Sequence, residues 1–410
     1  MNSIPQPTTN LMLAHPWWQR EDLKYINRRL YLAGQSLEQI AKQVGTPTFV
    51  YSTQRIRENI KRLRVALSQT GLEFDIYYAM KANRNPSILT HLAANGDIGI
   101  DACSPKEVLR AMSCGFSAEK ISFTGTSVSM DDWNFLYRQQ GIKINLDSLA
   151  ALKNYGAYGK GKKVGIRINP ALGLGYNDNT LLRYSGTEVT KFGIYQEQLD
   201  EAMAIARFYD LKISRVHFHT GCGYLNQQLP VWDEILAASL EFIDRLGNIN
   251  EVNLGGGLGV PHTSNDAPLD LSNWKKIIHR HFKGKNIRIA IEPGDYLLKD
   301  AGVLLLQTVY LEPRRDKFFL GVNGGFNLAI EPGFYQMPCE PTPCVIKGNK
   351  KIKVTIAGNI NESVDIWAKD IDIPEMNTGD TLVLINAGAY ASAMSSNHCM
   401  RGEFNEIVIP

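Results

Sequence analysis

Lys81 has the clearest potential for covalent chemistry, because it directly follows the apolar run Ile76–Met80. If that run is a buried strand, the amine lies in apolar surroundings. Burial lowers the pKa of a lysine and leaves a nucleophilic amine, as Schiff-base chemistry with an aldehyde requires. The competing interpretation is a surface lysine whose alkyl stem lies along the strand while its amine reaches water.

Three further groups of residues stand at the ends of other β-rich runs. His217 and His219 are two residues apart, so alternation along a strand directs both to one face. The glycines Gly255–Gly257 allow backbone N–H groups to approach an anion closely, although many such turns only reverse the chain. Glu292 closes another run, where a carboxylate can pair with the ring nitrogen of a cofactor. A lone histidine or glycine turn would be weak evidence, and the combination is more informative.

These four groups are together the parts that hold pyridoxal 5'-phosphate. The lysine binds the aldehyde, the histidine stacks on the ring, and the glycine N–H groups bind the phosphate. The carboxylate keeps the pyridine nitrogen protonated, so the ring can accept electrons. The sequence therefore predicts a pyridoxal-phosphate site.

The elements that must position these groups alternate between β-rich runs and helix-like stretches from about residue 50 to 305. Helical stretches such as Ser104–Cys114 and Gln196–Tyr209 have apolar residues three and four apart. Alternation of this kind predicts a parallel sheet, and eight units favour a closed (β/α)8 TIM barrel over an open doubly wound sheet. The eight runs are Ile76–Met80, Ile98–Asp101, Ile121–Thr124, Ile142–Leu146, Val164–Asn169, Ser214–His219, Val252–Leu254 and Ile287–Glu292.

After residue 305 helical periodicity almost disappears, and short strand-like runs separated by turn signals predict an antiparallel β domain. We expect a domain at 50–305, a second at 306–410, and an N-terminal extension at 1–49 that adds a helix (Ser36–Val44) and a strand to the β domain. The predicted strands are Val303–Leu311, Phe318–Val322, Cys344–Ile346, Ile352–Ile356, Thr381–Ile385 and Glu406–Ile409.

Composition excludes several classes of protein. The 410 residues contain 44 Lys and Arg against 41 Asp and Glu, so neither a nucleic acid nor an anionic membrane is expected as partner. We expect no membrane span, no secretion signal in the first 20 residues, and a cytoplasmic location. Six dispersed cysteines favour free thiols. His398 beside Cys399, with Cys339 and Cys344, lacks metal-ligand spacing, so no metal site is expected.

Taken together, the motifs resemble the fold-type III pyridoxal-phosphate decarboxylases, most closely the diaminopimelate decarboxylase group, over about residues 45 to 410. The order of so many matches makes the resemblance specific. The matching segments are Tyr78–Asn83, Asp101–Glu107, Ile144–Ser148, Arg167–Pro170, Lys191–Gly193, His217–Gly221, Gly255–Gly257, Glu292–Gly294, Gly358–Asp370 and Gly388–Tyr390.

The resemblance implies an enzyme that removes the α-carboxylate of an amino acid through a Schiff base at Lys81. It implies that the barrel is of the alanine racemase-like type. It also implies a homodimer in which the segment from Asn361 to Asp365 completes the partner's active site. The implied catalytic residues are Lys81, His219, Asn361 and Glu362. The implied cofactor-binding residues are Lys81, His219, Cys222, Gly255, Gly256, Gly257, Glu292 and Tyr390, and the implied substrate-binding residues are Asp295, Glu331, Tyr335, Glu362 and Asp365.

Two departures from the family pattern concern the chemistry at Cα and at the phosphate. Asn361 stands where the family usually has a cysteine that is thought to reprotonate Cα, and an amide cannot donate that proton. Water, Lys81 or Cys399 would have to supply it, or the reaction differs. Cys222 replaces a serine that contacts phosphate, which predicts looser phosphate binding unless backbone N–H groups compensate.

Two further departures concern the substrate. Asp295 and Glu331 stand where the family has arginines that help hold the distal carboxylate of diaminopimelate. At an effective dielectric near 20, one misplaced charge about 4 Å away costs roughly 4 kcal/mol. We therefore expect a diamino acid or modified amino acid with a cationic or neutral polar end as substrate, rather than meso-diaminopimelate.

Two alternatives remain open at this point. A racemase or epimerase would break the Cα–H bond instead of the bond to the carboxylate, and the missing cysteine favours it. A cofactor-binding protein without turnover is the other alternative, and the presence of Glu362, Asp365 and Tyr390 speaks against it.

Overall fold

The computed structural model describes residues 16–186 and 188–410, so the expectation for the N-terminal 15 residues lies outside the described part. The chain forms two compact units, and each is described by itself. The barrel unit comprises Asn59–Val260 and Pro268–Leu297. The β unit comprises the chain up to Glu58 together with Pro261–Ala267 and Leu298–Pro410. Sequence patterns gave no sign that the short segment Pro261–Ala267 would cluster with the β unit.

Eight parallel strands close into a barrel in the order β10-β11-β12-β5-β6-β7-β8-β9, which confirms the predicted (β/α)8 fold. Each predicted run overlaps one strand, with ends displaced by one or two residues. The strands are β5 (Phe74–Ala79), β6 (Gly99–Ala102), β7 (Ile121–Gly125), β8 (Lys143–Leu146), β9 (Lys163–Arg167), β10 (Lys212–His217), β11 (Glu251–Asn253) and β12 (Arg288–Ile291).

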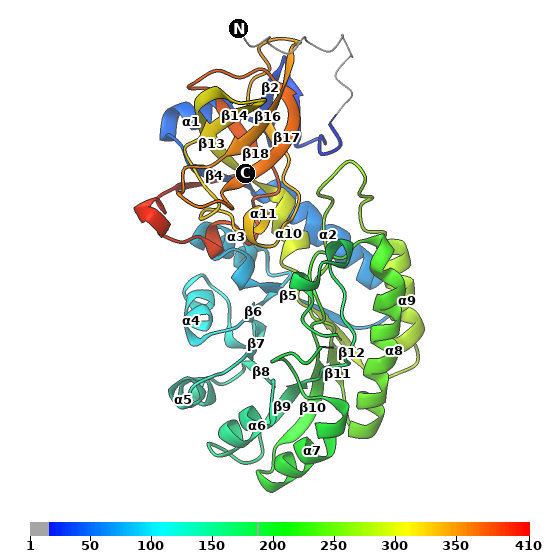
Figure 1. The fold of residues 1–410 in the computed structure, drawn as a ribbon. Coiled ribbons are helices and arrows are strands. Elements are labelled where there is room, and N and C mark those ends of the chain that lie inside the picture. The colour runs from blue at the N-terminus through cyan, green and yellow to red at the C-terminus, as the bar shows by residue number, and fades with distance from the viewer. Residues whose placement is uncertain (1–15, 187) are drawn as a thin grey trace. The chain divides into compact units, whose positions relative to one another are not determined.

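Helices lie outside the barrel strands (Figure 1), where their apolar faces cover the sheet. Ser104 and Ser148 cap two of them by accepting hydrogen bonds from backbone N–H groups three residues on, at 3.2 and 3.1 Å. Trp133, Trp232 and Trp274 are fully buried. The helices of this unit are α3 (Pro86–Asn95), α4 (Pro105–Ser113), α5 (Met130–Arg138), α6 (Leu149–Gly156), α7 (Leu199–Phe208), α8 (Leu229–Leu246) and α9 (Leu271–Phe282), while α2 (Thr53–Ser68) and α10 (Asp295–Leu298) span the unit boundaries.

The β unit contains an eight-stranded sheet with the path β15-β18-β13-β14-β16-β17, to which β4 and β19 are joined through β13. Most pairings are antiparallel as predicted, but β14 with β16 and β19 with β4 are parallel. The strands are β4 (Thr48–Ser52), β13 (Gly302–Arg314), β14 (Lys317–Val322), β15 (Pro341–Pro343), β16 (Lys351–Ala357), β17 (Ile366–Pro374), β18 (Thr381–Leu384) and β19 (Asn405–Ile409).

Two predictions in this sheet were wrong. No strand was predicted at β17, because Lys369, Asp370 and Asp372 interrupt its apolar pattern; these charges lie on the exposed positions of the strand. The predicted strand Cys344–Ile346 is displaced to the three residues before it, where two prolines had argued against a strand.

The N-terminal region joins the β unit, as predicted, through the helix α1 (Leu37–Val44) and the strand β4. A small sheet of β1 (Leu23–Ile26), β2 (Arg29–Leu32) and β3 (Gln35–Ser36) precedes them. Its buried leucines form one apolar core with Val303, Leu305 and Val383 of the large sheet. This burial gives the N-terminal region a stable place in the β unit.

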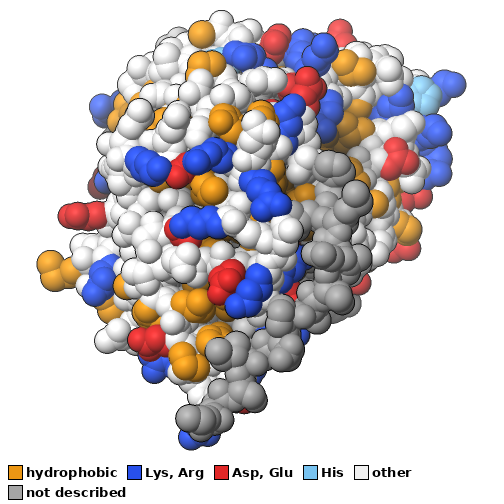
Figure 2. Space-filling model, turned by 90° about the horizontal axis from the view of Figure 1, so that it is seen from above, with side chains coloured by type: hydrophobic (Ala, Val, Ile, Leu, Met, Phe, Trp, Pro, Cys, Tyr) orange, Lys and Arg blue, Asp and Glu red, His pale blue; other side chains and the backbone are white. Residues whose placement is uncertain are grey.

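The surface carries mixed charge, as the net charge of +3 leads us to expect. In Figure 2, cationic and acidic side chains are interspersed over the visible face, and apolar side chains between them are mostly isolated. Within the described residues, no helix is both long and apolar enough to cross a membrane.

The buried histidine His262 lies in the segment that clusters with the β unit. Its backbone N–H donates to Asp266 Oδ2 at 2.8 Å, and Asn386 Nδ2 donates to the carbonyl of Pro261 at 2.8 Å. Burial, and next the positive charge of Lys299, lower the pKa of His262 from 6.5 to about 3. The neutral ring is therefore the native form over the whole range between these values.

This lowered pKa predicts that the β unit becomes less stable as the pH falls. Below about pH 6.5 the unfolded chain takes up a proton at His262 that the folded chain excludes, so the free energy of unfolding should fall by roughly 1.4 kcal/mol per pH unit. Urea unfolding between pH 7 and pH 5 measures this slope. His262→Gln should lose that part of the slope, and an unchanged slope in the variant would contradict the assignment.

Candidate active site

Lys81 lies directly after β5, in a single helical turn formed by Met80–Ala82. The hydroxyl of Tyr78 donates to the carbonyl of Asn83 at 2.8 Å and fixes this turn against the strand end. The amine Nζ stands 5.9 Å from the ring centre of Tyr184. The lysine thus occupies the C-terminal end of a barrel strand, where reactive groups of such barrels are found.

The electrostatic surroundings of Lys81 differ from the sequence-based expectation. Burial opposes the charged amine, but the acidic side chains of Cys103 and Asp101 beside it favour the charged form, so the pKa of Lys81 is raised. The expectation of a lowered pKa was wrong because it considered burial alone. As long as the amine is free, it is held as an ammonium among acidic neighbours.

Glu292 is held by hydrogen bonds on both of its carboxylate oxygens. It follows β12 directly, is 6% exposed, and receives hydrogen bonds on both oxygens: His217 Nε2 lies 2.8 Å from Oε2, and Asn253 Nδ2 donates to Oε1 at 2.7 Å. Burial alone would raise the pKa of Glu292, but the charge and hydrogen bond of His217 and the hydrogen bond of Asn253 lower it. The carboxylate is therefore anionic, as pairing with a protonated ring nitrogen requires.

The strand register explains this network. His217 ends β10 and is paired in register with Asn253, the last residue of β11. Glu292 follows the next strand, and its N–H donates to the carbonyl of Gly255 at 2.8 Å. His217 was predicted on the correct face but without a partner. Asn253 was not predicted as a site residue, although its position at a strand end was the available signal.

The glycine turn after β11 is needed for close packing of the backbone. A Cβ at Gly255, Gly256 or Gly257 would stand 2.2–2.3 Å from a carbonyl oxygen of a neighbouring segment, and Gly255 and Gly257 have φ of +68° and +95°. The N–H of Gly255 donates to Asn253 Oδ1 at 3.0 Å, and that of Gly256 donates to His219 Nδ1 at 3.3 Å. Phosphate binding by this turn stays a proposal. The N–H groups of Gly255 and Gly256 already donate within the chain, so the proposal depends mainly on the close approach that a backbone without side chains allows.

His219 lies two residues beyond β10 beside this turn. Its ring centre is 4.8 Å from that of Tyr184, and its Nε2 is 3.7 Å from Cys222 Sγ. Burial, and next the charge of Lys81, place the pKa of His219 well below its ordinary value. The structure thus brings together Lys81, His219 and Cys222, and a neutral imidazole is the form suited to stacking on a cofactor ring.

Asp101 was quoted in the sequence motifs without a role, yet it lies among these groups. It is 3% exposed, and its buried Oδ1 has no hydrogen-bond partner among residues 16–186 and 188–410. Burial, and next the charge of Glu292, raise its pKa well above the ordinary value for a carboxyl. Its place at the end of a barrel strand, β6, was the signal that could have identified it.

The remaining predicted substrate residues are also placed. Asp295 is 8% exposed and opens the short helix α10 in the barrel unit. In the β unit, Glu331 pairs with Lys299 at 2.7 Å, and Lys299 is 1% exposed. The Lys299 amine is 5.8 Å from the ring centre of Tyr390. Tyr335 follows the helical turn Glu331–Phe334 and donates its N–H to the carbonyl of Glu331. Glu331 is thus not an isolated negative charge.

Asn361 and Glu362 are exposed on a loop of the β unit, whereas Asp365 is 4% exposed. Asp365 accepts hydrogen bonds from the N–H groups of Phe326 and Ile360 at 2.7 and 2.6 Å. Both of its oxygens are therefore engaged by the backbone. We assign it the role of positioning the loop and keep Glu362 as the proposed substrate-facing carboxylate.

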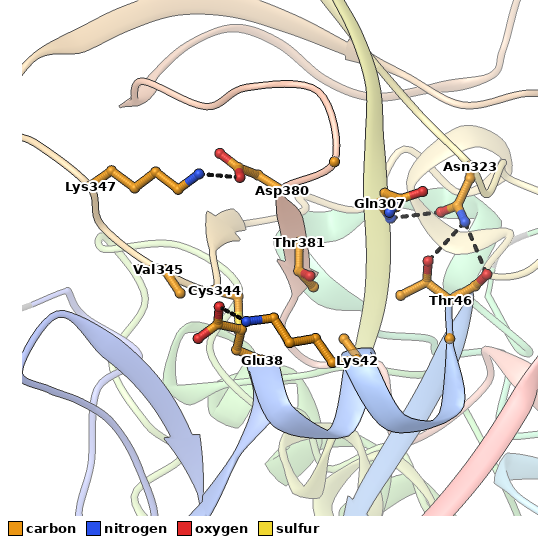
Figure 3. A pocket seen from close by; sticks show the side chains of 13 residues that line it. Glu38, Lys42, Thr46, Gln307, Asn323, Cys344, Val345, Lys347, Asp380 and Thr381 are labelled. Carbon is orange, nitrogen blue, oxygen red and sulfur yellow. Dashed lines mark hydrogen bonds and ion pairs between the residues drawn. The ribbon is translucent and has the colours of Figure 1, made fainter.

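A pocket of about 640 Å³ in the β unit contains none of these residues. Figure 3 shows its charged side chains paired with one another, Glu38 with Lys42 at 2.6 Å and Asp380 with Lys347 at 2.5 Å. Because these charges are satisfied within the chain, the pocket is not part of the candidate site. Within the described residues no group of three or more metal-binding side chains is found.

Comparison with known proteins agrees with this site. The family described as "Pyridoxal-dependent decarboxylase, pyridoxal binding domain" matches residues 53–299. This chain belongs to that family. It is a pyridoxal-phosphate-dependent amino-acid decarboxylase.

A diaminopimelate decarboxylase of Methanothermobacter thermautotrophicus is 32% identical to this decarboxylase, covering 93% of this chain and 90% of the relative. A solved diaminopimelate decarboxylase of M. jannaschii in complex with L-lysine has a TM-score of 0.86 at 26% identity, covering 95% and 93% of the two chains. The Helicobacter pylori enzyme complexed with L-lysine has a TM-score of 0.82 at 26% identity, covering 91% and 94%.

The residues of this decarboxylase fit the cofactor. The buried Oδ1 of Asp101 and Nδ1 of His217 have no partner within the described residues, so the site retains unused polar capacity beside the anionic Glu292. The glycine turn leaves no room for side chains next to His219. Lys81 would hold the cofactor aldehyde, His219 would stack on the ring, and Glu292 would pair with the ring nitrogen. The bound cofactor supplies the electron sink for decarboxylation.

The fit predicts separate effects of two substitutions. Lys81→Ala should abolish the borohydride-stable attachment of pyridoxal phosphate, detected by peptide mass spectrometry. Glu292→Gln should retain attachment but weaken cofactor affinity about tenfold or more, because an amide lacks the charge that a protonated ring nitrogen pairs with. Absorbance titration of the cofactor-free protein measures the affinity.

The exposed Lys153 offers a control for these measurements, since it pairs only with the exposed Glu201 at 3.5 Å. Lys153→Ala should keep both the attachment and the affinity. Attachment of the cofactor at a lysine other than Lys81 in the native protein would contradict the assignment.

Proposed function

We propose that this decarboxylase acts on a diamino acid or modified amino acid whose side chain ends in a cation or a neutral polar group, rather than on meso-diaminopimelate. The observation that carries the proposal is the ion pair of Lys299 with Glu331 at 2.7 Å. Glu331 and Asp295 stand at the two positions where the resembled family has arginines, so neither position carries a positive charge in this chain.

The ion pair also reduces the negative charge at these positions. Two acids in place of two arginines would make the surroundings strongly negative, but the charge of Lys299 cancels that of Glu331. The remaining difference is the absence of a guanidinium for a distal carboxylate. A polar or cationic end suits such surroundings better than a second carboxylate.

The names of the relatives favour the competing substrate. Both the curated relatives and the solved structures include diaminopimelate decarboxylases at 26–32% identity. The two related solved structures contain bound L-lysine. Meso-diaminopimelate is therefore the second candidate and the reference against which other substrates are compared.

The chain's own residues would act as follows. Glu292 keeps its negative charge because His217 and Asn253 hold both oxygens. Neutral His219 would pack against the ring face of the cofactor, and Lys81 would hold its aldehyde until the substrate amine binds. The site orients the bond between Cα and the carboxylate, and this orientation selects decarboxylation over breaking of the Cα–H bond. The alternative reaction is racemisation, and release of carbon dioxide from the substrate would exclude it.

We further propose that two chains form a homodimer with shared active sites. Phe334, Val364 and Met400 are 62%, 48% and 85% exposed, and all three lie on or beside the loops that carry Glu362. Large apolar side chains around an exposed charged residue are typical of an interface. Sedimentation at micromolar concentration should give about twice the chain mass, and a monomer would contradict this part of the proposal.

Substrate choice should respond to Glu331. In Glu331→Gln the charge of buried Lys299 is no longer cancelled, so kcat/KM for meso-diaminopimelate relative to L-lysine should rise about tenfold, equivalent to about 1.4 kcal/mol. Carbon dioxide release from a panel of L-lysine, L-ornithine, L-arginine and meso-diaminopimelate measures this ratio.

The same substitution at Glu312 is the matched control, because Glu312 forms only an exposed pair with Arg314 at 3.3 Å. Glu312→Gln should leave the ratio unchanged. If the native protein decarboxylates meso-diaminopimelate as efficiently as the best diamino acid, the substrate proposal is wrong.

A further inference from the structure

We propose that His398, held by Glu362, is the acid that returns the proton to Cα after decarboxylation, in the active site of the partner chain. The inference depends on the proposed function and on the proposed dimer, and it supplies the group for which Asn361 is unsuited. His398 Nε2 lies 3.1 Å from Glu362 Oε1, and both side chains are nearly half exposed.

Two loops of the β unit bring these side chains together. The first contains Glu362 and is fixed by Asp365, whose carboxylate accepts from the N–H groups of Ile360 and Phe326. The fit around this carboxylate is tight, because a Cβ at Gly325 or Gly358 would lie 2.3–2.8 Å from its oxygens. The position of Glu362 is therefore set by a buried anchor.

The second loop contains His398 and is fixed by Asn327, which is fully buried. The side-chain Nδ2 of Asn327 donates to the backbone carbonyls of Ser396 and Arg401 at 3.1 and 3.0 Å. The backbone carbonyl of Asn327 accepts from the N–H of Ser396 at 2.9 Å. These contacts hold both ends of the loop. Cys399 between them has a φ of +53°.

The two loops are connected through the neighbouring residues Phe326 and Asn327. The N–H of Phe326 binds Asp365, its ring contacts the His398 ring edge-on at a centroid distance of 6.3 Å, and Asn327 follows it in the chain. Two buried polar side chains thus serve to hold one exposed pair. An exposed ion pair contributes little to stability, so this construction is better explained by chemistry at the pair than by folding.

The residue types fit proton transfer. A histidine changes charge near neutral pH and can donate a proton, whereas the amide of Asn361 cannot. The contact with Glu362 fixes the orientation of the ring. Cys399 is also exposed, but no described contact orients its thiol, so His398 is the better candidate.

The step is balanced in atoms and charge. The bond between Cα and the carboxylate breaks, carbon dioxide leaves, and the electron pair remains with Cα. A proton from the His398 imidazolium forms the new Cα–H bond, which leaves a neutral imidazole. Solvent then returns one proton to His398, equal to the one proton that each decarboxylation consumes.

The test separates loss of carbon dioxide from delivery of the proton. With the best substrate, native protein should release carbon dioxide and amine in equal amounts. In His398→Gln, carbon dioxide should still form. The amount of amine should fall to about half the amount of carbon dioxide or less, because without the histidine the proton reaches atoms other than Cα. In deuterium oxide, the native enzyme should place deuterium stereospecifically at Cα, and the variant should give a mixture.

Controls exclude a structural effect. His281 forms another histidine–carboxylate pair, with Asp233 at 2.6 Å, and His281→Gln should keep equal amounts of the two products. Glu362→Gln should shift the product ratio in the same direction as His398→Gln, but less. The unfolding midpoint of the cofactor-free protein should be the same for native and His398→Gln chains.

Mixing Lys81→Ala chains with His398→Gln chains tests the position of the donor. Unfolded and refolded together at equal amounts, they should recover stereospecific deuterium incorporation at Cα to about a quarter of the native amount, since random pairing gives one intact site in half of the dimers. Equal amounts of products in His398→Gln, or no recovery on mixing, would overturn the proposal. Absence of carbon dioxide from native protein on every substrate would instead contradict the proposed function.

Discussion

The structure depends on keeping one carboxylate, Glu292, charged inside the closed barrel. A buried carboxylate tends to take up a proton, and only specific partners prevent this. His217 and Asn253 provide them from the two strands before it, so three consecutive strands must end at matching heights. The register of β10, β11 and β12 is therefore a requirement of the chemistry as well as of the barrel.

The same constraint explains the chemical asymmetry of the site. Asp101 is as deeply buried as Glu292, but its Oδ1 has no hydrogen-bond partner within the described residues and its pKa is raised, whereas that of Glu292 is lowered. Burial and the charge of Glu292 raise the pKa of Asp101, whereas His217 and Asn253 overcome burial at Glu292. A site that needs one permanent anion can contain a second acid only if that acid holds its proton.

The sequence was sufficient for the barrel because hydrophobic runs and helical periodicity alternate without interruption, and each run is short and apolar. It was insufficient for β17, where charges on the exposed positions hide the strand, and for the parallel pairings, which depend on tertiary contacts. Within the site, strand ends identified Lys81, His217 and Glu292. The pKa of Lys81 was predicted in the wrong direction, because the effect of neighbouring charges can be judged only once Asp101 and Cys103 are placed beside it.

The departures from the family pattern are better understood as linked changes than as separate losses. An acid at position 331 would be costly beside a substrate carboxylate, yet it is accompanied by the buried cation Lys299. Asn361 cannot donate a proton, yet the next residue, Glu362, contacts a histidine on another anchored loop. In both cases the residue that alters the chemistry is adjacent to a partner far away in sequence. Comparison of single motif positions shows only the change itself, and the three-dimensional structure is needed to find the residue that compensates for it.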